Sequence, residues 1–187
     1  KIYDYKSKKN NFDNRGNASL FLTDDYHVNQ YNYRTPKYHV FTTYLNFGFN
    51  PDDALAVGFN ADYTVNDFIR NPYSQKHHFL ANYFSGSEGY ELAYQGLFPA
   101  LTGGWFYGLD TRVTSSHYIR NFYGIGNRST NPKDESGERF NNVRAREFAF
   151  SPSINCNKNA ATFSAKLNYE ILKIAKTENR YISLPGV

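Results

Sequence analysis

The stretch from Tyr38 to Asp67 alternates apolar and polar residues so regularly that it restricts the chain to β-structure with two unlike faces. Every second position of its first arm carries Phe41, Thr43, Leu45, Phe47 and Phe49, and the second arm carries Leu55, Val57, Phe59, Ala61, Tyr63 and Val65 in the same way. A period of two is the signature of a strand with one apolar and one polar face. Each arm keeps this period for about a dozen residues, roughly twice the usual length of a strand in a soluble protein. The length indicates an apolar face that meets lipid.

The composition agrees with a membrane barrel and excludes other classes. Aromatic residues make up 18% of the chain although the mean hydropathy is −0.68. Outer-membrane barrels combine these properties, because a polar lumen dilutes the lipid-facing residues and aromatics collect in interfacial girdles. No stretch approaches the ~18 apolar residues of a membrane-spanning helix. The net charge of +4 is scattered, apart from a short basic run at 6–9, so we expect no binding to nucleic acid.

Further strands follow the hairpin at regular intervals. We expect them at 76–85, 90–98, 105–114, 139–152 and 161–171, with a turn at 153–159. In the first of these the alternation is blurred, because His77, Phe79, Ala81 and Tyr83 compete with Leu80 and Phe84 for one face. The strand at 139–152 alternates imperfectly, which is compatible with a bulge.

Two regions follow from this pattern. Residues 1–37 are predicted to be a polar connector to an upstream domain, with one short strand at 18–23. Residues 38–187 are predicted to form the N-terminal part of an all-β, transmembrane antiparallel barrel. Seven strands is an awkward number for a complete barrel, because bacterial barrels usually have an even count. The chain also lacks Met, and we expect it to be one part of a larger protein.

The apolar faces of the clearest strands carry no charged residue, whereas their opposite faces do. The candidate lumen-facing charges are Asp62, Glu91, Asp110, Arg112, Lys166 and Glu170. A charge on the lipid-facing side costs about 2–4 kcal/mol at the middle of the membrane, which would keep charges to the lumen. We expect Asp110 and Arg112 to pair with neighbours across the barrel wall.

Residue patterns for catalysis or metal binding are weak. Asp25-Tyr26-His27 matches an Asp-x-His metal motif, but a lone match of this kind is a frequent accident. His77 and His78 are adjacent on a strand and therefore point to opposite faces. Cys156 is the only cysteine. We predict no catalytic residue, no metal site and no cofactor, so that this span is not an enzyme.

Three motifs carry a resemblance to a family. Val28-Asn-Gln-Tyr-Asn32, Gly48-Phe-Asn-Pro-Asp-Asp53 and Asn121-Phe-Tyr-Gly-Ile-Gly-Asn127 resemble, in order and spacing, a group of Bacteroidota outer-membrane proteins. In that group a BamA-like barrel is joined to an N-terminal calcineurin-like metallophosphoesterase domain. The resemblance implies a barrel of about sixteen strands, of which this chain supplies strands one to seven. It places 50–53 and 117–138 outside the cell and 68–75 and 99–104 in the periplasm.

The resemblance also implies a role and partners. The first strand would be the barrel seam, with Phe41, Leu45, Phe47 and Phe49 as candidate seam residues. The partners would be outer-membrane lipid (lipopolysaccharide and phospholipid), the rest of the barrel and a larger outer-membrane complex. The expected role is membrane anchoring or outer-membrane protein and envelope biogenesis. Two alternatives stay open: the anchor of a metallophosphoesterase whose catalytic domain lies upstream, and a soluble lipocalin-like barrel that binds ligands.

Overall fold

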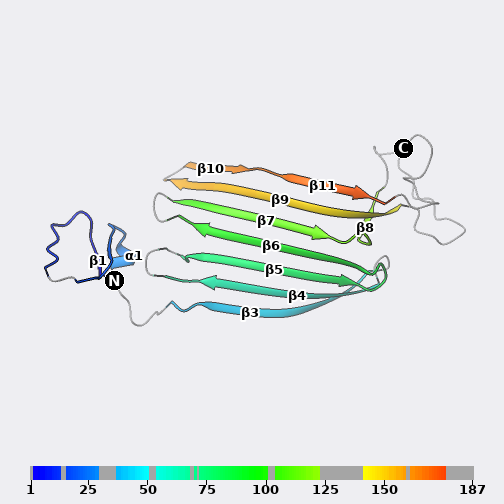
Figure 1. Cartoon of the computed structure of the whole chain (residues 1–187), viewed down its shortest axis with the longest axis horizontal. Helices are drawn as coiled ribbons and strands as arrows, with labels where there is room; N and C mark the ends of the chain where they lie inside the picture. Colours follow the sequence, from blue (N-terminus) through cyan, green and yellow to red (C-terminus); the bar gives the residue numbers. More distant parts are fainter. Residues whose placement is uncertain are drawn as a thin grey trace, which may run out of the picture.

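The chain is built almost entirely of antiparallel strands (Figure 1). The structure is a computed structural model that describes residues 2–13, 16–29, 37–50, 54–67, 70, 72–100, 104–122, 141–158 and 161–175. Its elements are β1 (Ile2–Asp4), β2 (Leu20–Leu22), α1 (Tyr26–Asn29), β3 (Val40–Asn50), β4 (Ala54–Val65), β5 (Gln75–Phe84), β6 (Gly89–Pro99), β7 (Trp105–Thr114), β8 (Ile119–Asn121), β9 (Asn142–Lys158), β10 (Ala161–Lys166) and β11 (Tyr169–Ile174). The all-β prediction is confirmed.

One large sheet holds nine of these strands. Seven of them lie side by side in the order β10-β9-β7-β6-β5-β4-β3, and the other two, β8 and β11, pair with β9. β11 follows β10 along one side of β9, and β8 follows β7 along the other. The nine strands therefore occupy seven positions, the number expected from the sequence. Because all neighbours in this sheet are antiparallel, the two edges, β3 and the β10–β11 line, run in the same direction (Figure 1).

The hairpin expected at 38–67 is present as β3 and β4. Its register pairs Phe41 with Tyr63 and Phe49 with Leu55, so that the two alternating sets share one face. The predicted strand at 105–114 coincides with β7, and those at 76–85 and 90–98 agree with β5 and β6 to within one residue at each end.

The predictions for the last two strands need correction. β9 runs from Asn142 to Lys158, so the turn expected at 153–159 is wrong up to Lys158. Those residues stay extended because they pair on both sides, as Cys156 does with Trp105 and with Phe163. The strand expected at 161–171 is two strands, β10 and β11, which are separated at 167–168.

Pro152 on β9 explains the break between β10 and β11. The Leu167 N–H donates to the Pro152 carbonyl at 3.0 Å, but proline has no N–H with which to complete the pair. The register is unchanged across the break, since Lys166 pairs with Ser153 and Tyr169 with Phe150. The ladder is thus interrupted without a slip.

The irregularity expected in the strand at 139–152 lies on the strands that oppose it. Five residues separate Val113 from Ile119, whereas three separate their partners Phe148 and Arg144. The fully buried Thr114 bridges this bulge. Its Oγ1 accepts the Glu147 N–H at 2.8 Å and lies 3.3 Å from the Ala145 carbonyl, to which it donates. A side-chain hydroxyl thereby replaces the missing main-chain partner.

The N-terminal lead-in contains a small paired unit. β2, within the strand expected at 18–23, pairs in parallel with β1. The rings of Tyr3 and Phe21 stack between them at 5.5 Å, and Val28 on α1 is buried. In the described part of the chain no helix has the length and hydropathy that crossing a membrane requires.

Several predicted loops lie partly or wholly outside the described residues. They are 30–32 of the first motif, 51–53 of the hairpin turn, 68, 69 and 71 of the first connection, 101–103 of the second, and 123–138 of the long polar segment, which includes the Gly-Ile-Gly stretch.

Candidate functional site

The register sorts the side chains of the sheet into two faces of opposite character. Across the strands, one row of partners reads Leu45, Phe59, Ala81, Leu92, Val113, Phe148 and Ile171. The adjacent row reads Tyr44, Asn60, Leu80, Ala93, Arg112, Ala149 and Glu170. We call the side that carries the first row, with every second residue from it along each strand, the apolar face, and the other side the polar face. The blurred strand is resolved: His77, Phe79, Ala81 and Tyr83 lie on the apolar face.

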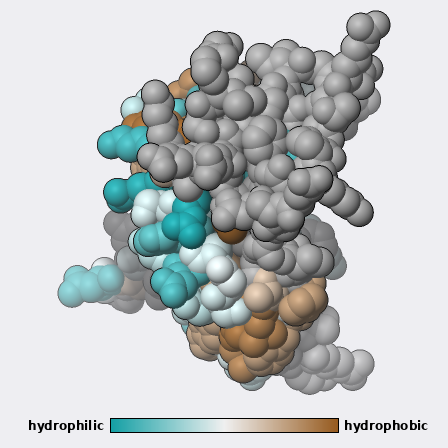
Figure 2. Space-filling view, turned by 90° about the vertical axis from the view of Figure 1, so that its right-hand side faces the viewer, coloured by the Kyte–Doolittle hydropathy of each residue, from teal (hydrophilic) through white to brown (hydrophobic). Residues whose placement is uncertain are grey.

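The apolar face is largely exposed. The four candidate seam residues are all on it and on the edge strand β3, with exposed fractions of 66% for Phe41, 62% for Leu45, 68% for Phe47 and 77% for Phe49. Seen along the strands, hydrophobic residues gather at the lower right of the molecule and hydrophilic ones along its left (Figure 2). Large exposed apolar patches mark surfaces that contact a protein partner, a membrane or a ligand.

Aromatic rings form a belt across one end of the apolar face. The Tyr63 ring lies 6.1 Å from Phe41 and 6.1 Å from His77, and the His77 ring lies 5.6 Å from Phe98. Further along, Trp105 and Phe163 meet edge to face at 6.4 Å. In membrane proteins, belts of Tyr and Trp lie at the membrane–water interfaces, where the polar edges of the rings reach the headgroups.

Gly96 makes room for part of this belt. A Cβ at this position would lie 2.6 Å from the Tyr94 hydroxyl oxygen and 2.7 Å from Cε2 of Phe98. The His77 Nδ1 lies 2.9 Å from the same hydroxyl, and its Nε2 lies 3.1 Å from Gln75 Oε1. Both ring nitrogens of His77 thus have a hydrogen-bond partner on this face.

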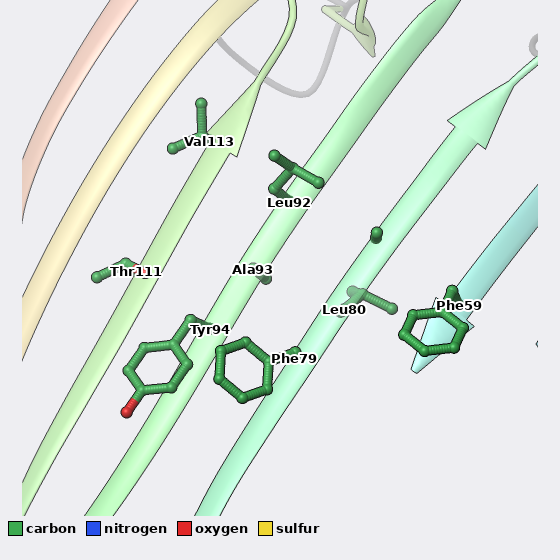
Figure 3. Close-up of a pocket in the computed structure, with 9 residues that line it drawn as sticks. Phe59, Phe79, Leu80, Leu92, Ala93, Tyr94, Thr111 and Val113 are labelled. Carbon is green, nitrogen blue, oxygen red and sulfur yellow. The ribbon is translucent and has the colours of Figure 1, made fainter. Parts of the chain in front are cut away.

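The middle of the apolar face is hollowed. Ala81 is the small side chain in its row, between Phe59 and Leu92. The groove around it has a volume of about 340 Å³, and the rings of Phe79 and Tyr94 stand side by side at one end of it (Figure 3). Its lining is apolar apart from the hydroxyls of Tyr94 and Thr111.

All six candidate lumen-facing charges lie on the polar face, where each has a partner. Asp62 pairs with His78 at 3.0 Å, so the two adjacent histidines do point to opposite faces. Asp110 accepts hydrogen bonds from Lys166 at 2.7 Å and from Gln95 at 2.9 Å.

A larger ionic network is centred on Arg112. Its guanidinium donates to Glu91 at 2.7 Å, to Glu147 at 3.3 Å and to the Tyr118 hydroxyl at 3.1 Å. Asp110 and Arg112, which were expected to pair across the barrel wall, thus both have partners on other strands of the sheet, Lys166 on β10 and Glu91 on β6 among them.

The sequence prediction missed the second half of this network. Glu147 has a side chain only 6% exposed, and it also binds Arg120, which in turn lies 3.9 Å from Glu170. Counting in steps of two from Phe148 and Phe150 would have placed Glu147 on the polar face. Arg120 had no such signal, since it lies on a three-residue strand beyond a bulge.

Asparagines complete the polar face between β3 and β6. Asn60 donates to Asn46 at 2.9 Å and Asn82 donates to Glu91 at 3.0 Å. Gly58 on β4 lies between Asn46 on β3 and Asn82 on β5. The carboxamide oxygens of these two asparagines both extend over it. Both donor carboxamides, those of Asn60 and Asn82, thus have a partner on a neighbouring strand.

The described residues offer little for catalysis. None of them form a group of three or more His, Cys, Asp or Glu side chains that could hold a metal ion. Asp25 directly precedes α1. Cys156, the only cysteine of the chain, is buried on the apolar face. No protein-family model, curated protein or solved structure matches the chain, so the two faces of the sheet are the basis for a functional conclusion.

Proposed function

We propose that this chain is the front part of a BamA-like β-barrel in the bacterial outer membrane, with its apolar face against lipid and its polar face toward the lumen. It would act there without catalysis in this span, as a membrane anchor or in outer-membrane protein and envelope biogenesis. The observation that carries the proposal is an exposed apolar face that spans all seven strand positions, opposite a polar face on which all six candidate charges have partners.

The strand lengths support this proposal. β3 to β7 have 10 to 12 residues each. At about 3.3 Å per residue this is roughly 33–40 Å along a strand, and a tilt of about 40° reduces it to roughly 25–30 Å across the membrane. The apolar band of outer-membrane barrels is about 25 Å tall.

The edges of the sheet support a larger barrel. β3 and the β10–β11 line each have one open side among the described residues, and both edges run in the same direction. They cannot pair with each other in the antiparallel manner of such barrels. Closure needs an odd number of further antiparallel strands, which the proposal assigns to the rest of the barrel. In this arrangement β3 would form the seam with the final strand.

Two neighbouring residues of β3 test the proposal. Leu45 and Tyr44 are both exposed, at 62% and 47%, but they lie on opposite faces. In a soluble protein Leu45→Arg would be tolerated, because it replaces an exposed apolar residue by a charged one. In a barrel it costs about 2–4 kcal/mol at mid-membrane, whereas Tyr44→Arg faces water.

The measurement is recovery of the protein in the urea-washed outer-membrane fraction of bacterial cells, together with heat-modifiable migration on gels. We expect Leu45→Arg to reduce both strongly and Tyr44→Arg to leave both near the wild-type level. If wild-type protein is recovered as a compact monomer without detergent, the proposal is wrong.

A further inference from the structure

The apolar face carries one cluster of charges, at the end of the sheet opposite the aromatic belt. Arg146 on β9 and Lys173 on β11 are direct cross-strand partners. Arg144 lies two residues further along β9 on the same face, beside the end of β11, where the Ala175 N–H donates to its carbonyl. All three side chains are exposed. We call Arg144, Arg146 and Lys173 the basic cluster.

Within the residues that the structure describes, the basic cluster lacks the carboxylate partners that three cations of the polar face have. On the polar face Arg112, Arg120 and Lys166 each lie within 4 Å of a carboxylate. Among the described residues, no acidic side chain pairs with any member of the basic cluster. Like charges directly opposite each other on antiparallel strands are destabilising, since their Cβ atoms are about 5 Å apart. The pair of Arg146 and Lys173 thus keeps an unfavourable contact that a bound anion would relieve.

The residues next to the cluster indicate what kind of anion fits. The next two rows inward along the same strands are Phe148 with Ile171 and Phe150 with Tyr169. All four of these side chains are exposed, with fractions between 38% and 53%. A ligand that lies along β9 and β11 would meet apolar side chains first and three cations after them. Acyl chains followed by a phosphate headgroup have this order of chemistry.

We infer that the basic cluster binds the phosphate headgroup of an anionic membrane lipid, whose acyl chains lie on the Phe148–Ile171 and Phe150–Tyr169 rows. The inference rests on the proposed function, because it needs the apolar face in contact with lipid. It adds a site and a lipid class: phosphate-bearing anionic lipids in preference to zwitterionic ones. Arginine supplies paired donors that match phosphate oxygens, and lysine supplies a point charge.

The test compares two triple variants that remove the same charge. Arg144→Gln, Arg146→Gln and Lys173→Gln together remove the basic cluster. Lys6→Gln, Lys8→Gln and Lys9→Gln together lower the net charge equally, at exposed positions of the N-terminal lead-in. Each protein is reconstituted as the full chain in phosphatidylcholine vesicles that contain spin-labelled phosphatidylglycerol or spin-labelled phosphatidylcholine. The readout is the relative association of the two labelled lipids with the protein.

We expect the wild type and the lead-in variant to prefer phosphatidylglycerol about fivefold, and the cluster variant to show no preference. The preference should decrease with added salt, because charges near the membrane surface are screened. A wild-type protein that inserts but does not distinguish the lipids, or a cluster variant that keeps the preference, overturns the inference. A protein that does not float with the vesicles overturns the proposed function instead.

Two further measurements keep the result specific. Lys173→Glu places a carboxylate opposite Arg146, so it should stabilise the protein in pure phosphatidylcholine and reduce the extra stability that phosphatidylglycerol gives the wild type. Inorganic phosphate should reduce the lipid preference no more than sulfate does at equal ionic strength. If phosphate at low concentration abolishes the preference selectively, the cluster binds a soluble anion and the inference is wrong.

Discussion

The Lys166 ammonium on β10 and the Asp110 carboxylate on β7 form an ion pair across the strand between them, with Nζ 2.7 Å from Oδ2. Glu170 on β11 makes a second contact of this kind, 3.9 Å from Arg120 on β8. In the first pair the cation is on the edge line, and in the second it is in the interior of the sheet. A two-residue slip of the edge line would keep its apolar face but break both pairs. We conclude that these two contacts help to fix the register of the last strands.

Removing the first of these contacts should loosen β10. We expect Lys166→Met to cost about 0.5 kcal/mol, because both groups are partly exposed to water. The effect should appear as faster hydrogen exchange of β10 amides in detergent micelles. The charge swap Lys166→Asp with Asp110→Lys should restore much of the protection. If Lys166→Met leaves the exchange of β10 amides unchanged, the ion pair has no role in holding the edge strand.

Arg112 should contribute more than any exposed pair. Arg112→Met would leave Glu91 without its cation and the buried Glu147 with Arg120 alone. Removing one partner from a buried ionic network leaves a charge that is poorly solvated, so we expect a loss of about 2–4 kcal/mol in the free energy of unfolding. Urea titration in micelles measures it. Arg112→Lys should lose about 1–2 kcal/mol, because it keeps the charge but not the fork of donors. Equal stability of all three proteins would contradict this account.

Two glycines on the polar face should respond differently to alanine. At Gly58 a Cβ would lie 2.1 Å from Asn46 Oδ1 and 2.3 Å from Asn82 Oδ1. Gly58→Ala must therefore displace both carboxamides and break the bond between Asn60 and Asn46, at a cost of about 1–2 kcal/mol. At Gly48 the nearest atom is Ala56 Cβ at 3.9 Å, which is ordinary contact. Gly48→Ala should be neutral or slightly stabilising in the same urea titration, and a cost as large as that at Gly58 would refute the explanation.

Pro152 offers a change that should stabilise the sheet. Pro152→Ala supplies the N–H that is missing opposite the Leu167 carbonyl, so the ladder can run unbroken from β10 into β11. The expected gain is about 0.5–1 kcal/mol, the net value of one hydrogen bond. In this variant, slower exchange of the newly introduced amide than of amides at the open edge would demonstrate the new bond. Pro152→Gly is a matched control, since it adds the same donor but increases the freedom of the unfolded chain.

The elements that sequence analysis located well are those whose side chains alternate without interruption. β3, β4 and β7 were predicted almost residue by residue, because one face of each is continuously apolar. The opposite faces followed from the same count, which is why Asp62, Glu91, Asp110, Arg112, Lys166 and Glu170 were all placed correctly on the polar face.

The errors occurred where main-chain pairing overrides local composition. Ser153, Asn155 and Asn157 suggested a turn, yet they are the polar face of a strand whose apolar face continues through Ile154 and Cys156. Arg120 joins the ionic network through a bulge of the β7–β8 side, and no local pattern predicts a bulge of that length. The basic cluster was also missed, because Arg144 and Arg146 made the alternation of β9 look imperfect.

The edge-to-face contact of Trp105 with Phe163 gives the protein an optical reporter. Trp105 is the only tryptophan of the chain, and it sits on β7 while Phe163 sits on β10, with β9 between them. Its emission therefore reports the environment of a single point, where three strands meet at one end of the sheet. A shift of that emission would show when the last strands join the others, without any added label.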